Sequence, residues 1–267
     1  RLCKRNMRDA QAQHARAAGA VAGRHAPNTL SDMRRGDGWA AAEAGEAEGL
    51  LDLELVALGS EDVSSELFAE AIARGVDLIG GAPHLAADRD AELDRLLTLA
   101  EQLGVGVDMH TDEALTGEPT IVELARRTGE WTDTTASAGH CSRLGTLPTD
   151  ELAPVIDVIV AADLGIITLP ITNLYLQGWD APVATPRGLT AVRALLDAGA
   201  RIGAGADNVR DPFNPLGRCD HLETVSLLVT AAHVSIDEAY SLASDGSRSV
   251  MRLPEAGAFV GGRAEFV

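Results

Sequence analysis

A histidine and two acids stand close together in the stretch GVGVDMHTDE (104–113), namely His110, Asp112 and Glu113. They follow small and β-branched residues that are typical of a buried strand. An imidazole nitrogen and a carboxylate oxygen can bind one divalent metal ion, and such an ion lowers the pKa of a water molecule toward neutrality. A nearby carboxylate is then needed to move protons. We therefore expect His110 to bind a metal, Glu113 to transfer protons and Asp112 to cap the next turn.

Three more residues of this kind end candidate strands: His84, His140 and Asp207. Any single polar residue at a strand end is most simply a helix cap or a loop residue. Together with His110, however, they would lie on one rim of a parallel sheet, because parallel strands end on the same side. The set therefore favours a site over isolated caps.

The elements that must position these residues alternate between short apolar runs and helices of 3.6-residue periodicity, the pattern of βα units around a parallel sheet. Candidate strands cover residues 20–25, 51–58, 76–84, 105–110, 132–140, 165–171 and 201–207, and clear helices cover residues 90–104, 149–165 and 186–199. The spacing predicts an α/β fold, a (β/α)8 TIM-type barrel whose active site lies at the carboxyl ends of its strands. Residues 39–52 are predicted to form a surface helix. A single domain over residues 1–267 is expected.

Composition narrows the classes of function. The 267 residues carry a formal net charge of -18, which argues against nucleic acid as a partner because phosphate is held by clustered Lys and Arg. We find no apolar run long enough for a membrane span and no secretory leader. Three scattered cysteines favour a reducing cytoplasm over a disulfide framework. Lys4 is the only lysine, which excludes a phosphate-binding Walker loop, an internal Schiff base and a lysine-bridged metal pair.

Four motifs occur in order along the chain: VDMHTDE (107–113), ASAGHCSRLG (136–145), LPITNLYLQG (169–178) and GADNVRDPFNPLG (205–217). From about Leu51 to the C-terminus, this ordered set resembles the amidohydrolase superfamily, and most of all its cytosine deaminase branch. These proteins are metal-dependent hydrolases that remove an exocyclic amine from a heterocycle. The resemblance implies a barrel fold, one divalent metal ion (zinc or iron) and a small heterocyclic substrate.

The resemblance also implies roles for the catalytic and metal-binding residues. His110 would bind the metal, and Glu113 would protonate a ring nitrogen of the substrate. His140 would orient the attacking water and stabilise the charged adduct. Asp207 would bind the metal and relay a proton to the departing ammonia.

Three further residues are expected to bind substrate on the same grounds. Asn208 and Phe213 stand where the family lines its pocket, and His84 matches a Pro-His pair that follows a strand in the family. The simplest interpretation of the segment from Asp207 to Gly217 is a rigid loop, and we expect it to be both rigid and pocket-forming. Gln177 could serve the pocket or the packing.

Two departures from the family pattern stand out. The first strand of the family carries a His-x-His pair of metal ligands, and this sequence contains no such pair. We therefore expect the barrel to be incomplete at its N-terminus, the small flanking β domain to be largely absent, and a metal held by His110 and Asp207 alone to be bound weakly. His25 would end the second strand. The family's Phe-Pro-Gln is replaced by residues 57–60, Ala-Leu-Gly-Ser, so the substrate need not be cytosine.

Three hypotheses follow. The first is hydrolytic deamination of an amino-substituted heterocycle such as a cytosine-like base, a pterin or a triazine. The second is hydrolysis of a cyclic amide or another C-N bond by the same site. The third is an inactive barrel that binds a small molecule or a partner. Family habit suggests a homo-oligomer. Structural roles are expected for His14, His221 and His233, an inert buried thiol for Cys141, and a helix cap for Asp220.

Overall fold

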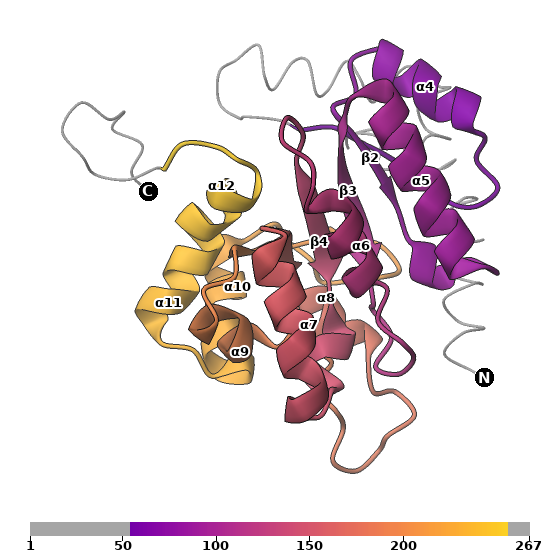
Figure 1. Ribbon diagram of the computed structural model, residues 1–267. Helices are drawn as coiled ribbons and strands as arrows, with labels where there is room; N and C mark the ends of the chain where they lie inside the picture. The colour runs from indigo at the N-terminus through magenta and orange to yellow at the C-terminus, as the bar shows by residue number, and fades with distance from the viewer. Residues whose placement is uncertain (1–53, 256–267) are drawn as a thin grey trace. The chain divides into compact units, whose positions relative to one another are not determined.

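The computed structural model describes residues 54–255 (Figure 1). The chain divides into two compact units, of which the first ends at His110 and the second begins at Thr111. The predicted strand 20–25, the predicted helix 39–52 and His25 lie outside the described residues. Within the described range, no helix combines the length and the apolar character that crossing a bilayer requires. The single-domain organisation stays a prediction.

The first unit consists of βα repeats in chain order. Its elements are β1 (Val56–Gly59), α4 (Ser65–Ala73), β2 (Leu78–Gly81), the 3-10 turn η1 (Pro83–Leu85), α5 (Arg89–Leu103) and β3 (Gly106–Thr111). The strands pair in parallel, β1 with β2 and β2 with β3. The two helices lie side by side next to the strands (Figure 1). Three of the predicted strands and one predicted helix are thereby confirmed.

Close packing of α5 on β2 explains the glycine at position 81 in that strand. A Cβ atom placed on Gly81 would lie 2.4 Å from a methyl carbon of Leu96, which is fully buried. Helix α5 begins at Asp88, whose side chain accepts a hydrogen bond from the Ala91 amide, and it ends at Gly104 in the left-handed conformation. The predicted stop at Gly104 is confirmed, and β3, which carries His110, begins two residues after it.

One acid of the first unit has a perturbed pKa. Partial burial, followed by repulsion from Asp108 and Asp77, raises the pKa of Glu54 from 4.5 to about 7, although its side chain keeps contact with solvent. The folded protein then binds more protons than the unfolded chain between pH 4.5 and 7, so stability declines as the pH rises through this window.

Glu54→Gln is therefore expected to stabilise the protein at pH 8 and to have little effect at pH 5. Discounted for solvent screening, the gain at pH 8 is about 1 kcal/mol, or a rise in Tm of about 2–4 °C. Thermal unfolding of Glu54→Gln and of the unaltered protein, at pH 5 and at pH 8, measures the change in Tm. An equal shift of Tm at both pH values would contradict the assigned cause.

The second unit continues the pattern with three more parallel strands. Strand β4 (Ala136–His140) pairs with β5 (Gly165–Thr168), which pairs with β6 (Ile202–Ala204). Its helices are α6 (Ile121–Thr128), α7 (Thr149–Ala161), α8 (Pro170–Leu176), α9 (Val192–Asp197), α10 (His221–Leu227), α11 (Ile236–Ser241) and α12 (Ser247–Val250), with a 3-10 turn η2 (Ser142–Thr146) and π turns η3 (Leu228–Ala232) and η4 (Leu242–Gly246). All three predicted strands are present.

All five residues of β4 are buried. A strand buried on both faces is typical of parallel sheets that are covered by helices. Asp220 caps α10 by accepting hydrogen bonds from the Leu222 and Glu223 amides, as predicted. Cys141 is buried, which fits the inert thiol expected from the sequence.

Candidate active site

His140 occupies a constrained position at the end of β4. It and Cys141 both have positive φ angles, 67° and 50°, a conformation that non-glycine residues rarely adopt. Hydrogen bonds hold this turn, because the Cys141 amide donates to Thr111 O at 2.9 Å and the Thr190 hydroxyl donates to His140 O at 2.5 Å. The side chain of His140 is buried. Backbone strain of this kind is often retained at functional sites, where it fixes the direction of a side chain.

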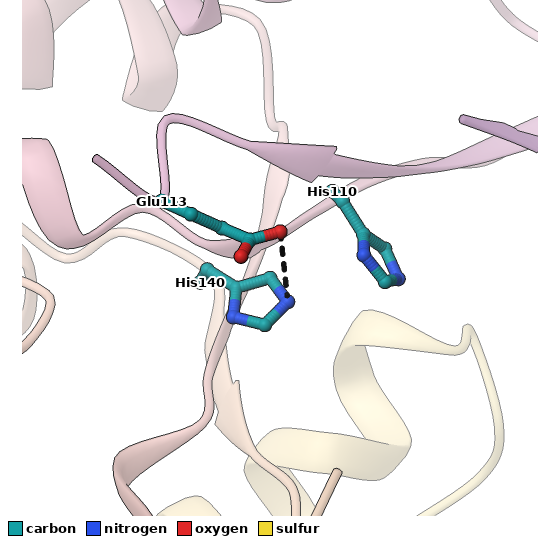
Figure 2. A group of neighbouring side chains, drawn as sticks. All are labelled: His110, Glu113 and His140. Carbon is teal, nitrogen blue, oxygen red and sulfur yellow. Dashed lines mark ion pairs between the residues drawn. The ribbon is translucent and has the colours of Figure 1, made fainter. Parts of the chain in front are cut away.

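Two acids face the imidazole of His140. Its Nε2 atom lies 3.6 Å from Glu113 Oε1 (Figure 2) and 3.9 Å from Asp207 Oδ2. Glu113 is 6% exposed, so little water separates the groups. Asp207 Oδ2 is buried and accepts no hydrogen bond from any residue between 54 and 255. A buried carboxylate oxygen in this state is unfavourable unless a positive charge lies beside it.

His110 contributes the third member of the group. It lies in β3, three positions before Glu113, and ligand atoms of His110, Glu113 and His140 all lie within 4.8 Å of one another (Figure 2). Imidazole nitrogens and carboxylate oxygens form the donor set that suits zinc and iron. His110, Glu113 and His140 therefore fit a divalent cation, and the buried Oδ2 atom of Asp207 lies 3.9 Å from His140 Nε2.

The residue before Glu113 has a structural role. The Asp112 carboxylate is buried and accepts hydrogen bonds from the Thr120 amide and hydroxyl, both at 2.8 Å, and from the Ile121 amide at 3.0 Å. It therefore caps the start of α6, as the sequence predicts for it. The arrangement fixes the loop from which Glu113 projects.

Asp112→Ala is expected to lower the free energy of unfolding by about 2–3 kcal/mol, because it leaves buried donors without an acceptor. Asp112→Asn keeps one acceptor oxygen and tolerates the positive φ of 51°, so its loss is expected to be smaller, about 1 kcal/mol. Urea unfolding of the three proteins gives the comparison. Equal losses for both variants would show that the side-chain oxygens do not carry this role.

Two of the predicted strand-end residues lie elsewhere than expected. His84 lies in η1 rather than at the end of β2, because Pro83 starts a 3-10 turn there. Its Nδ1 is 3.1 Å from His110 O, and because a carbonyl only accepts, Nδ1 carries the donated proton. Asp207 follows β6 by three residues, and its φ of 57° turns the chain after the strand.

The loop after Asp207 is organised by an acid that we did not single out from the sequence. Asp211 accepts hydrogen bonds from Asn208 Nδ2 at 2.6 Å and from the Phe213 and Asn214 amides at 2.9 Å. Asn214 Nδ2 in turn donates to Asn208 O at 2.9 Å. The predicted rigid loop is thus present, and the roles of Asn208 and Phe213 in substrate binding remain predictions.

The hydrogen-bonding partner of the His140 side chain was missed, whereas Gln177 had been left open between a pocket and a packing role. Asn173 Oδ1 lies 2.8 Å from His140 Nδ1, and Gln177 Nε2 donates to Glu113 O at 2.5 Å. Both partners come from α8 or its end, four residues apart, so they extend from one side of the helix. Their spacing in NLYLQ is the one signal in the sequence that could have suggested a shared role.

Comparison with known proteins places this arrangement in a family. The model of the amidohydrolase family (Amidohydro_3) matches residues 4–267. The pterin deaminase of Rhizobium rhizogenes is 33% identical over 199 residues, which cover 71% of this chain and 45% of that protein. The N-isopropylammelide isopropyl amidohydrolase of Pseudomonas sp. is 26% identical over 189 residues, which cover 67% of this chain and 43% of that protein. The chain thus spans less than half the length of these curated relatives.

Among solved structures, the chain is similar to the 5-methylcytosine deaminase of Klebsiella pneumoniae in complex with phosphonocytosine. The TM-score is 0.73 and the identity 26%, over 81% of this chain and 57% of that one. The parallel strands in chain order agree with an incomplete (β/α) barrel. The chain belongs to the amidohydrolase family, in the cytosine deaminase-like branch that its motifs resemble.

Proposed function

We propose that the protein hydrolyses the bond between a heterocyclic carbon and its exocyclic amine, releasing ammonia. The observation that carries this proposal is a pair of carboxylates that face His140 Nε2. The buried Glu113 lies 3.6 Å from it, and Asp207, whose Oδ2 atom is buried, lies 3.9 Å from it. Deamination needs two proton transfers, one to the ring and one to the leaving amine, and two acids beside one imidazole can supply them. The deaminases among the relatives support the same reaction.

His110 and Asp207 are the residues that would hold a divalent cation, zinc or iron. When bound, the cation supplies the Lewis acidity that makes a water molecule nucleophilic near neutral pH. The imidazole of His110 and the buried Oδ2 of Asp207 are suitable donors for it.

The protein's own residues divide the proton transfers. Glu113 gives its proton to a ring nitrogen, so that the ring carbon accepts the water oxygen. Asp207 takes one proton from the water and passes it to the amine, which leaves as ammonia. The hydroxyl proton that remains on the adduct returns to Glu113 as the ring carbon becomes a carbonyl. His140 holds the water at Nε2 and stabilises the adduct between these steps.

Substrate recognition is assigned to Asn208, Phe213 and His84. The hydrogen bond from Asn208 Nδ2 to Asp211 leaves its amide oxygen directed away from that acid, where it could accept a hydrogen bond from an amino-substituted ring. The relationship to a pterin deaminase and the lack of a glutamine within residues 57–60 favour a pterin over cytosine. A cytoplasmic location and a homo-oligomeric state remain predictions.

The test is an assay of ammonia release by the full-length protein with cytosine, isocytosine, a pterin and an amino-triazine, in the presence of Zn²⁺ or Fe²⁺. We expect release from at least one substrate, with the matching oxo-heterocycle as product. Ring-opened product without ammonia would assign the site to cyclic amides instead. A metal-loaded protein that is inactive on the whole panel would contradict deamination.

A further inference from the structure

One short helix contacts two of the residues that the proposed reaction uses, the side chain of His140 and the backbone of Glu113. Asn173, in α8, is 1% exposed, and its Oδ1 is 2.8 Å from His140 Nδ1. Gln177, which ends the same helix, donates from Nε2 to the backbone carbonyl of Glu113. Gly188 approaches the Cβ of Gln177 so closely that no larger residue fits there. The helix is therefore packed in a way that fixes both contacts.

The side-chain amide of Asn173 carries an acceptor, Oδ1, and a donor, Nδ2. Its Oδ1 atom is the one that contacts His140. Its Nδ2 is buried, and no hydrogen-bond acceptor for it is found among the described residues 54–255. An amide oxygen only accepts, so the contact at 2.8 Å requires a proton on His140 Nδ1. The opposite ring nitrogen, Nε2, is the one that faces Glu113 and Asp207.

We propose that Asn173 is a positioning residue that keeps a proton on His140 Nδ1 and thereby confines proton exchange and water binding to Nε2. Hydrogen bonding at one ring nitrogen of a histidine commonly selects the tautomer and orients the ring in this way. The Thr190 hydroxyl donates to the backbone carbonyl of His140. The direction of the imidazole is therefore fixed both by its backbone and by its Nδ1 atom. The catalytic consequence rests on the proposed function, but the tautomer does not.

The tautomer is measured by correlating the imidazole nitrogens and protons of 15N-histidine-labelled, metal-free protein by NMR at pH 8. We expect His140 Nδ1 to give the signal of a protonated nitrogen. His84 serves as an internal reference, because its Nδ1 donates to a carbonyl. An unprotonated Nδ1 on His140 in the unaltered protein would overturn the proposal, whatever any variant does.

Variants separate positioning from packing. Asn173→Leu removes the acceptor at similar volume, and we expect it to shift the His140 proton away from Nδ1. Asn173→Asp keeps an acceptor oxygen and is expected to retain the proton there. Thr172→Val is the matched control, because the Thr172 hydroxyl is buried in the same helix and makes no hydrogen bond to any described residue. An unchanged tautomer in a folded Asn173→Leu protein would overturn the assignment.

In the deamination assay, Asn173→Leu is expected to lower kcat by about 10–100-fold with little change in KM, the usual loss when a group that orients a functional histidine is removed. Asn173→Asp should recover most of that activity, and Thr172→Val should retain it. A raised KM with an unchanged kcat would contradict a positioning role for Asn173. If the unaltered protein deaminates nothing, the proposed function fails while the NMR result still decides the tautomer.

Discussion

Glu113→Gln is expected to lower kcat/KM for deamination by about 10²–10⁴-fold, the range that general acid-base catalysis contributes. Glutamine preserves the size of the side chain and removes the proton that Glu113 gives to the ring nitrogen. The side chain is 6% exposed and lies 3.6 Å from His140 Nε2, so bulk water is poorly placed to replace it. Steady-state kinetics on the best substrate of the panel measures the effect.

Glu118→Gln provides the control, since it makes the same change on an exposed residue of the same loop. It should leave kcat/KM within about twofold, as expected for a surface substitution away from the site. Full activity in Glu113→Gln would remove Glu113 from the reaction. Loss of activity in both variants would point to the loop rather than to the carboxyl group.

Asp207→Ala is expected to lower the affinity for Zn²⁺ by more than about 100-fold and to abolish measurable deamination. Removing residues that merely orient a metal ligand already lowers affinity by about 10–100-fold, and a lost ligand exceeds this. The Asp207 Oδ2 atom is buried beside His140 Nε2, so another side chain cannot readily take its place. Calorimetric titration of metal-free protein gives the affinity.

Glu113→Gln is the matched comparison for this experiment. It removes a second carboxylate that faces the same imidazole, but Glu113 is assigned to proton transfer and not to the metal. We therefore expect that variant to keep its affinity for Zn²⁺ within about tenfold. Loss of the metal in Glu113→Gln and its retention in Asp207→Ala would reverse the two assignments. The close grouping of His110, Glu113 and His140 would then mark the ligand set.

The parts of the fold that local patterns control were predictable. Strands of small and β-branched residues, the helix predicted over residues 90–104, and the cap at Asp220 all lie where the sequence indicates. Each depends on residues a few positions apart, and capping and periodicity act over that range. Helix α9 is shorter than its predicted range of 186–199, because residues 186–190 precede it without helical structure.

Side-chain partners distant in sequence were not predictable. Asn173 and Thr190 bond to His140 across 33 and 50 positions, and no periodicity encodes such a pairing. The positive φ angles of His140 and Cys141 could not be predicted from the sequence either, because neither residue type favours the left-handed region. The site residues themselves came from an ordered set of motifs, which identified the ionisable groups but not the groups that orient them.

The account depends most on a single cation that His110 and Asp207 share. Anomalous X-ray diffraction at the zinc edge, on crystals of the full-length protein prepared with Zn²⁺, tests this directly. We predict one strong peak within bonding distance of both side chains, with Glu113 near it but not bound to it. A peak bound to His110, Glu113 and His140 without Asp207, or no peak beside His110, would contradict the account.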